Sequence, residues 1–235
     1  MTHEVVPLEA WIDARIALLA EEKEFTRRRD ELSRRRRALP WEAVTKAYSF
    51  EGPDGSETLA ELFAGRSQLI VYHFMFEPEV DEGCPHCSFW ADNFDPVIVH
   101  LNARDVTLVA VSRAPYAKLA AYRERMGWGF KWLSSGESDF NADLGVFFTP
   151  EAEDERVYNY ATIAPGRSDR EGLSVFVKDG AGAVFHTYSA YARGIDLVNT
   201  AYNYLDLVPK GRDEAGQKPH PQAWVRRHDE YGRAS

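Results

Sequence analysis

The sequence predicts an α/β fold in which helices flank a central mixed β-sheet, with a long helix added at the N-terminus. Two runs, 69–76 (LIVYHFMF) and 106–112 (VTLVAVS), are nearly all apolar and rich in β-branched or aromatic residues. Such runs are typical of central strands covered on both faces. A helical pattern after each run indicates that the two strands are parallel. The turn 179–182 (DGAG) separates two further strand-like runs, which indicates an antiparallel hairpin.

Residues 8–38 read as one long charged helix that ends before Pro40. The second apolar position of each heptad is polar from about Glu21 onward, so the helix is not a self-sufficient coiled coil. We expect it to lie along the main domain or to pair with a second copy as a homodimer. Apolar residues recur along it at Trp11, Leu18, Phe25, Leu32 and Leu39.

The remaining elements follow from local patterns. A short strand enters the turn at 52–55, and residues 58–63 form one or two helical turns. Helices are expected at 88–101, 115–126 and 195–205, and strands at 130–133, 157–163, 173–178 and 183–189. We therefore predict a helical arm at 1–43, a main domain at 44–207 and a surface tail at 208–235.

Composition excludes several classes of protein. The 235 residues are 44% hydrophobic and carry a formal net charge of −9. An acidic surface repels phosphate backbones, which argues against a nucleic-acid partner. The basic run Arg34–Arg37 is expected to pair with acidic neighbours such as Glu31. The N-terminus lacks the pattern of a secretory signal, and no long apolar stretch suggests a membrane span, so we expect a cytoplasmic location without membrane attachment.

The two cysteines of the chain, Cys84 and Cys87, lie in the sequence Cys84-Pro85-His86-Cys87. In a reducing compartment such a close pair is typical of catalytic or metal-binding sites. A structural role is a poorer interpretation, because bridging so short a segment removes little entropy from the unfolded chain.

The dithiol has the parts needed for thiol–disulfide exchange. If Cys84 begins a helix, the free amide groups there favour its thiolate, and a protonated His86 favours it further. Asp81 and Glu82 oppose ionisation. Cys87, one turn on, is placed to resolve a mixed disulfide. This chemistry needs no metal or organic cofactor.

Two other interpretations of the pair remain open. One is a metal site, for which His73, His86 and His100 are the candidate additional ligands, although none falls in a recognised zinc spacing. The other is a pair of thiols without a chemical role.

The order of elements, with Cys-x-x-Cys opening the helix after a central strand, resembles the thioredoxin fold. The dipeptide Pro85-His86 resembles that of strongly oxidising bacterial disulfide-forming proteins, and residues 54–76 resemble the opening of peroxiredoxin-like domains. Several stretches resemble a bacterial thioredoxin-like family known as domain of unknown function 899, and this resemblance covers nearly the whole chain. They are 81–92, 110–115, 138–141, 186–189, 191–194 and 224–231.

The chain also departs from those patterns. Where thioredoxins carry a cis-proline opposite the cysteines, it has Gly172-Leu173-Ser174. In the family pattern that proline shapes the substrate groove and keeps metals off the thiols. Where peroxiredoxins place a threonine three residues before the reactive cysteine, it has Asp81.

The leading hypothesis is therefore a thiol–disulfide oxidoreductase with Cys84, Cys87 and His86 as catalytic residues. Its substrate would be a protein disulfide or a small-thiol disulfide. The alternatives are a non-enzymatic interaction or assembly protein of the same fold, and a metal-binding member of it. The candidates for the walls of a substrate groove are Trp90, Arg113, Ser174 and Tyr188.

Overall fold

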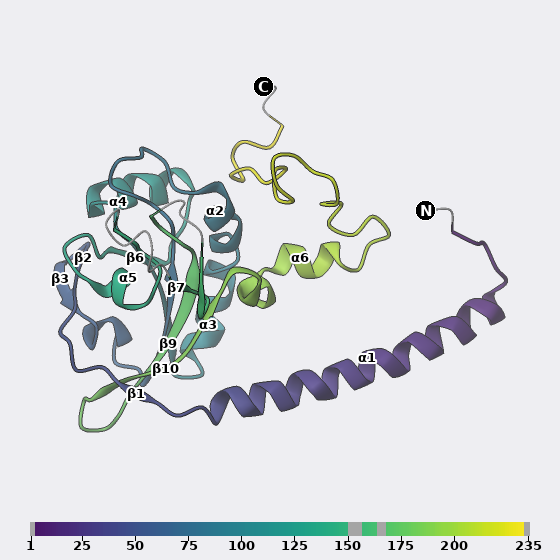
Figure 1. Ribbon diagram of the computed structural model, residues 1–235, viewed down its shortest axis with the longest axis horizontal. Helices are drawn as coiled ribbons and strands as arrows, with labels where there is room; N and C mark the ends of the chain where they lie inside the picture. Colours follow the sequence, from purple (N-terminus) through teal and green to yellow (C-terminus); the bar gives the residue numbers. More distant parts are fainter. Residues whose placement is uncertain (1–2, 150–156, 164–167, 233–235) are drawn as a thin grey trace. The chain divides into compact units, whose positions relative to one another are not determined.

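The computed structural model describes residues 3–149, 157–163 and 168–232, and the chain falls into two compact units, Met1–Pro40 and Trp41–Ser235 (Figure 1). The first unit is built on helix α1 (Leu8–Arg37), which confirms the predicted helix. Its first turn closes with a 3.0 Å hydrogen bond from the Trp11 amide to the Pro7 carbonyl. Arg34 pairs with Glu31 at 2.7 Å, as the charge pattern predicts.

The second unit contains an eight-stranded mixed sheet in the order β1-β10-β9-β4-β5-β6-β2-β3. β4, β5 and β6 are mutually parallel, because helical segments carry the chain back between them, whereas β9 and β10 form the predicted antiparallel hairpin. The strands are β1 (Glu42–Ala43), β2 (Ser49–Gly52), β3 (Gly55–Thr58), β4 (Gln68–His73), β5 (Val106–Ser112), β6 (Lys131–Ser134), β9 (Gly172–Lys178) and β10 (Val184–Tyr191). The two apolar runs of the sequence are the neighbouring central strands β4 and β5.

Helices cover both faces of this sheet. Within the described residues of the second unit, the helices are η1 (Glu61–Phe63), α2 (Pro85–Ala91), α3 (Asp95–Asn102), α4 (Tyr116–Arg125), α5 (Phe140–Asp143), η3 (Ala192–Val198) and α6 (Thr200–Leu205). Successive side chains of a strand point to opposite faces. Tyr72 therefore packs with residues of α2, α4 and α6, while Val71 packs with residues of η1 and α5. The dithiol belongs to the face on which Tyr72 lies.

Three segments differ from the predicted elements. The helix expected at 88–101 is two helices, because Pro96 lies in the first turn of α3 and cannot continue a helix from before it. The helix expected at 195–205 is likewise divided at Asn199, whose side chain caps α6 by accepting a hydrogen bond from the Tyr202 amide. The strand expected at 157–163 is a small separate hairpin of β7 (Val157–Tyr158) and β8 (Ala161–Thr162).

The segment after α6 belongs to the same compact unit as the sheet. Many of its side chains are exposed, as expected for a segment along the surface, yet Val225 is only 3% exposed. Through this segment, residues far along the sequence reach the neighbourhood of the cysteines.

None of the helices in the described ranges is long and apolar enough to cross a lipid bilayer.

Candidate active site

Cys84 and Cys87 lie at the start of α2, after a loop of residues 74–83 that follows β4. Cys84 is the N-cap of this helix, and Pro85 lies in its first turn. The backbone amides of the first turn have no acceptor within the helix, so the missing amide hydrogen of a proline costs no hydrogen bond there. The backbone of Met75 contacts both cysteines. Its carbonyl accepts from the Cys84 amide at 3.2 Å, and its amide donates to the Cys87 sulfur at 3.4 Å. The segment just after β4 thus holds both cysteines.

The two sulfurs have different environments. Both cysteines are free thiols; Cys84 is 7% exposed and Cys87 is 1% exposed. Hydrogen bonding from the Cys87 side chain, supported by His86 and the Cys87 amide, lowers the pKa of the Cys84 thiol well below its ordinary value and outweighs burial. Burial, followed by the nearby Cys84, raises the pKa of the Cys87 thiol well above its ordinary value. Of the two thiols, Cys84 is therefore the one that ionises more easily.

His86 connects Cys84 to the C-terminal segment. Its Nε2 lies 3.2 Å from the Gln222 carbonyl, which can only accept, so Nε2 carries a hydrogen. Its Nδ1 lies 3.9 Å from the Cys84 sulfur. In the neutral ring Nδ1 is then free to accept the thiol proton. Hydrogen bonding to Cys84 raises the pKa of His86 against the effect of burial, which is the response expected of a thiolate–imidazolium pair.

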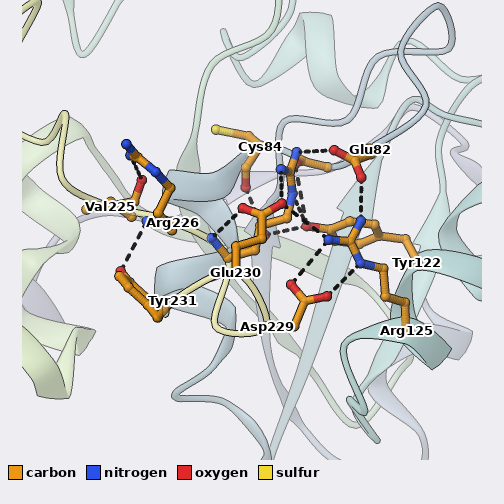
Figure 2. A network of polar contacts seen from close by, with 12 residues as sticks. Glu82, Cys84, Tyr122, Arg125, Val225, Arg226, Asp229, Glu230 and Tyr231 are labelled. Carbon is orange, nitrogen blue, oxygen red and sulfur yellow. Dashed lines mark hydrogen bonds and ion pairs between the residues drawn. The ribbon is translucent and has the colours of Figure 1, made fainter. Parts of the chain in front are cut away.

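A polar network holds the loop before Cys84 (Figure 2). Arg227 donates to the Gly83 carbonyl at 2.9 Å and to the Tyr122 hydroxyl at 2.9 Å, and it pairs with Glu82 at 3.1 Å. The Tyr122 hydroxyl is also 3.0 Å from that of Ser88 in α2. In Figure 2 the Cys84 sulfur points away from this network, so these contacts position the cysteine and leave its sulfur free to react.

Arg125 extends the network toward the C-terminus. It pairs with Glu82, with Asp229 at 2.9 Å and with Glu230 at 3.3 Å (Figure 2). His228 meets Asp92, just past the end of α2, at 2.7 Å. The C-terminal segment is therefore tied to the loop before the dithiol and to the helix after it.

A pocket of about 350 Å³ opens beside Cys84. Its walls include Met75, Glu77, Glu82, Ser168 and Arg227. Cys84, the more easily ionised of the two cysteines, also lines it.

Of the predicted groove residues, Arg113 contacts a residue that lines this pocket. It pairs with Asp169 at 2.6 Å, and its guanidinium lies 3.4 Å from the hydroxyl of Ser168, which lines the pocket. Burial outweighs the Arg113 charge and raises the pKa of Asp169 to about 6.

The other groove candidates lie elsewhere. Trp90 is a core residue whose Nε1 donates to the Ile195 carbonyl at 3.0 Å. Tyr188 is partly buried against the cluster that contains the cysteines. The structure does not bring Ser174 to the dithiol, because its hydroxyl lies 2.8 Å from Nε2 of His73 on the opposite face of the sheet.

Of the candidate metal ligands, only His86 lies beside the dithiol. His73 is fully buried, burial lowers its pKa to about 3, and it packs against Phe140 away from the cysteines. His100 lies in the last turn of α3 and is exposed. Within the described ranges, no three His, Cys, Asp or Glu side chains come together as ligands for a metal ion.

Sequence reasoning missed the residues that support the cysteines. Tyr122, Arg227 and Gln222 are separated from the two cysteines by 35 to 143 positions in the sequence, so no local spacing points to them. The one signal available was the stretch 224–231, which carries part of the family resemblance and includes Arg227.

Comparisons with known proteins agree with the resemblance seen in the sequence. The sequence model of a family described as bacterial protein of unknown function (DUF899) matches residues 1–231. None of the curated proteins compared with the chain matches it.

Solved structures with a related fold include several peroxiredoxins. Peroxidoxin BcpB from Mycobacterium tuberculosis is 14% identical, with 69% of this chain and 94% of that chain covered and a TM-score of 0.46. A variant of Xanthomonas campestris peroxiredoxin Q is 14% identical, with 69% and 98% covered and a TM-score of 0.45. The mitochondrial 2-cys peroxiredoxin from Plasmodium falciparum is 12% identical, with 76% and 98% covered and a TM-score of 0.40. At sequence identities this low, the activities of these proteins cannot be assigned to this chain. The strand order and the helices on both sheet faces are those of a thioredoxin-like fold, which confirms the predicted fold class.

Proposed function

The chain belongs to the bacterial family of unknown function DUF899, and from the geometry of its own residues we propose that it is a thiol–disulfide oxidoreductase. The observation that carries the proposal is the unequal pair of sulfurs at the start of α2. Cys84 is poised as a thiolate beside a pocket, and Cys87 is a buried thiol that hydrogen-bonds to it.

The exchange proceeds in two balanced steps. The Cys84 thiolate attacks one sulfur of a substrate disulfide, a Cys84–substrate disulfide forms, and the other substrate sulfur leaves as a thiolate. Cys87 then loses its proton and attacks the Cys84 sulfur, which releases the second substrate thiolate and leaves a Cys84–Cys87 disulfide. The substrate gains two electrons and the protein loses two.

His86 accepts and returns the proton of the Cys84 thiol. Neutral His86 accepts the Cys84 proton at Nδ1 while its Nε2–H stays on the Gln222 carbonyl. The imidazolium so formed can return that proton to a departing thiolate. The cytoplasmic location predicted from the sequence suits this direction, because a reducing compartment regenerates the dithiol.

We expect His86→Asn to move the pH profile of Cys84 reactivity upward. Loss of the imidazolium removes one cause of the lowered pKa, so the midpoint for alkylation of Cys84 shifts toward the free-thiol value of about 8.5. The measurement is the rate of iodoacetamide reaction against pH, with the labelled residue identified by peptide mass. His100→Asn, which changes an exposed histidine at the end of α3, is the matched control and should leave the midpoint in place. Identical midpoints for both variants would remove His86 from the mechanism.

We expect the pocket to favour disulfides that carry positive charge. Among the described residues that line it, the one cation is Arg227, which already engages Gly83, Tyr122, Glu82 and Glu230. The carboxylate of Glu77, in contrast, makes no hydrogen bond or ion pair within the part of the chain that the structure describes.

The test compares cystamine, a dication, with the neutral 2-hydroxyethyl disulfide and with oxidised glutathione, an anion. Glu77→Gln should lower the cystamine rate, relative to the neutral disulfide, by about fivefold, which corresponds to about 1 kcal/mol, the attraction of two unit charges 4 Å apart in water. Glu51→Gln, in the exposed part of β2, is the control. Equal relative rates in Glu77→Gln and wild type would contradict this preference while leaving exchange itself intact.

A further inference from the structure

Helix α1 presents an apolar stripe that its own unit does not cover. The helix is 30 residues long, and none of its residues is buried. Residues spaced by seven lie nearly on one side of a helix, because seven residues make about two turns. The stripe consists of Trp11, Leu18, Phe25 and Leu32, with Leu39 just beyond the helix end.

The charges of α1 are divided between its two halves. Residues 8–24 hold five acidic and two basic side chains, a net charge of −3, whereas residues 25–39 hold seven basic and two acidic, a net charge of +5. A parallel, in-register pair of such helices would set like charges side by side. An antiparallel pair sets the acidic half of each helix against the basic half of the other.

We propose that two copies of this chain pair through α1 in antiparallel orientation, with Phe25 at the two-fold axis. In this register Leu18 lies opposite the partner's Leu32, so the stripe is covered along its length. A second copy of the chain is the partner that fits the stripe, because its basic half complements the acidic half of this helix and its acidic half complements the basic half.

Flanking charges fit the same register. Glu21 and Glu22 come alongside the partner's Arg28 and the partner's Arg29. Within the described residues Glu21 and Arg29 have no ion pair of their own, whereas Arg28 already bonds Glu24 at 3.1 Å. Glu21 and Arg29 are thus available for contacts between copies. The proposal does not depend on the chemistry of the dithiol.

The full-length chain tests it by sedimentation equilibrium. We expect a dimer for wild type, a monomer for Phe25→Glu, which sets two carboxylates against each other at the axis, and a dimer for the control Phe25→Leu. Circular dichroism checks that Phe25→Glu still folds. A wild-type chain that stays monomeric, as it would if the helix packed on its own main domain, overturns the proposal.

Orientation is tested by crosslinking in a background lacking Cys84 and Cys87. Leu18→Cys mixed with Leu32→Cys should form a disulfide-linked heterodimer under mild oxidation, and Leu18→Cys alone should not. Efficient crosslinking of Leu18→Cys alone would show a parallel pair and would overturn the antiparallel arrangement. The double variant Glu21→Arg, Glu22→Arg should weaken the dimer. Adding Arg28→Glu and Arg29→Glu to the same chain should restore it.

Discussion

Cys84→Ser is expected to reduce the rate of disulfide reduction to the uncatalysed background. The serine hydroxyl has the shape of the thiol and is slightly smaller, but it does not ionise near neutral pH and cannot attack a disulfide. The buried Cys87 cannot substitute for it, because its raised pKa keeps it protonated and its side chain is 1% exposed. The measurement is reduction of a neutral disulfide by the pre-reduced protein, followed by thiol release.

Cys87→Ser should separate the two steps of the same reaction. Cys84 still attacks, but nothing resolves the intermediate, so one substrate sulfur stays attached to each chain and is released by added dithiol. Intact mass gives the stoichiometry. Wild-type turnover in both serine variants would show that the dithiol does not carry the reaction and would end the proposal.

Gly83→Ala is expected to have the second largest effect, on stability and on reactivity together. A Cβ at this position would lie 2.7 Å from the Phe74 ring, closer than Cβ atoms approach other atoms in proteins, and 3.0 Å from the Tyr122 ring, which is also a very tight contact. Moving these rings costs about 1–3 kcal/mol, the usual range for overpacking a core. Because the Gly83 carbonyl accepts from Arg227 and the next residue is Cys84, the shift should also slow alkylation of that thiol.

The control for this change is Gly180→Ala. Gly180 lies in the turn between β9 and β10, and a Cβ there would meet no atom within 4 Å. Its effect should stay within about 0.5 kcal/mol, as for surface substitutions in general. Urea unfolding of both variants measures the difference. Equal free energies of unfolding would show that the loop before the dithiol is not tightly packed.

The main elements of the fold could be predicted because their signals are local. The β-branched run 106–112 is buried on both faces and could hardly be anything but a central strand. The division of the helix after the dithiol was also readable, since Pro96 stands inside the stretch 88–101 that was predicted to be continuous. The division at Asn199 depends on one side chain capping a turn, which apolar periodicity does not report.

The site could be predicted only in part, for the same reason. The spacing of Cys84 and Cys87 places both at the first turn of a helix, whatever the rest of the fold does. Ser174 was selected by its position in a family pattern, but neighbouring residues of a strand alternate between faces, and its hydroxyl lies on the face away from the sulfurs. Arg227 contacts the Gly83 carbonyl, 144 positions away in the sequence, and only the folded chain brings these two residues together.

The most direct test of the central claim is the order in which the two thiols react. The reduced, folded protein is treated with a limiting amount of iodoacetamide at neutral pH, before and after mild oxidation, and each cysteine peptide is weighed. Because Cys84 ionises more easily than Cys87, we expect almost all of the label on Cys84 before oxidation. After oxidation we expect no label on either cysteine, and a chain lighter by two hydrogens because a Cys84–Cys87 disulfide has formed. Equal labelling of both cysteines, or a chain that forms no internal disulfide, would contradict it.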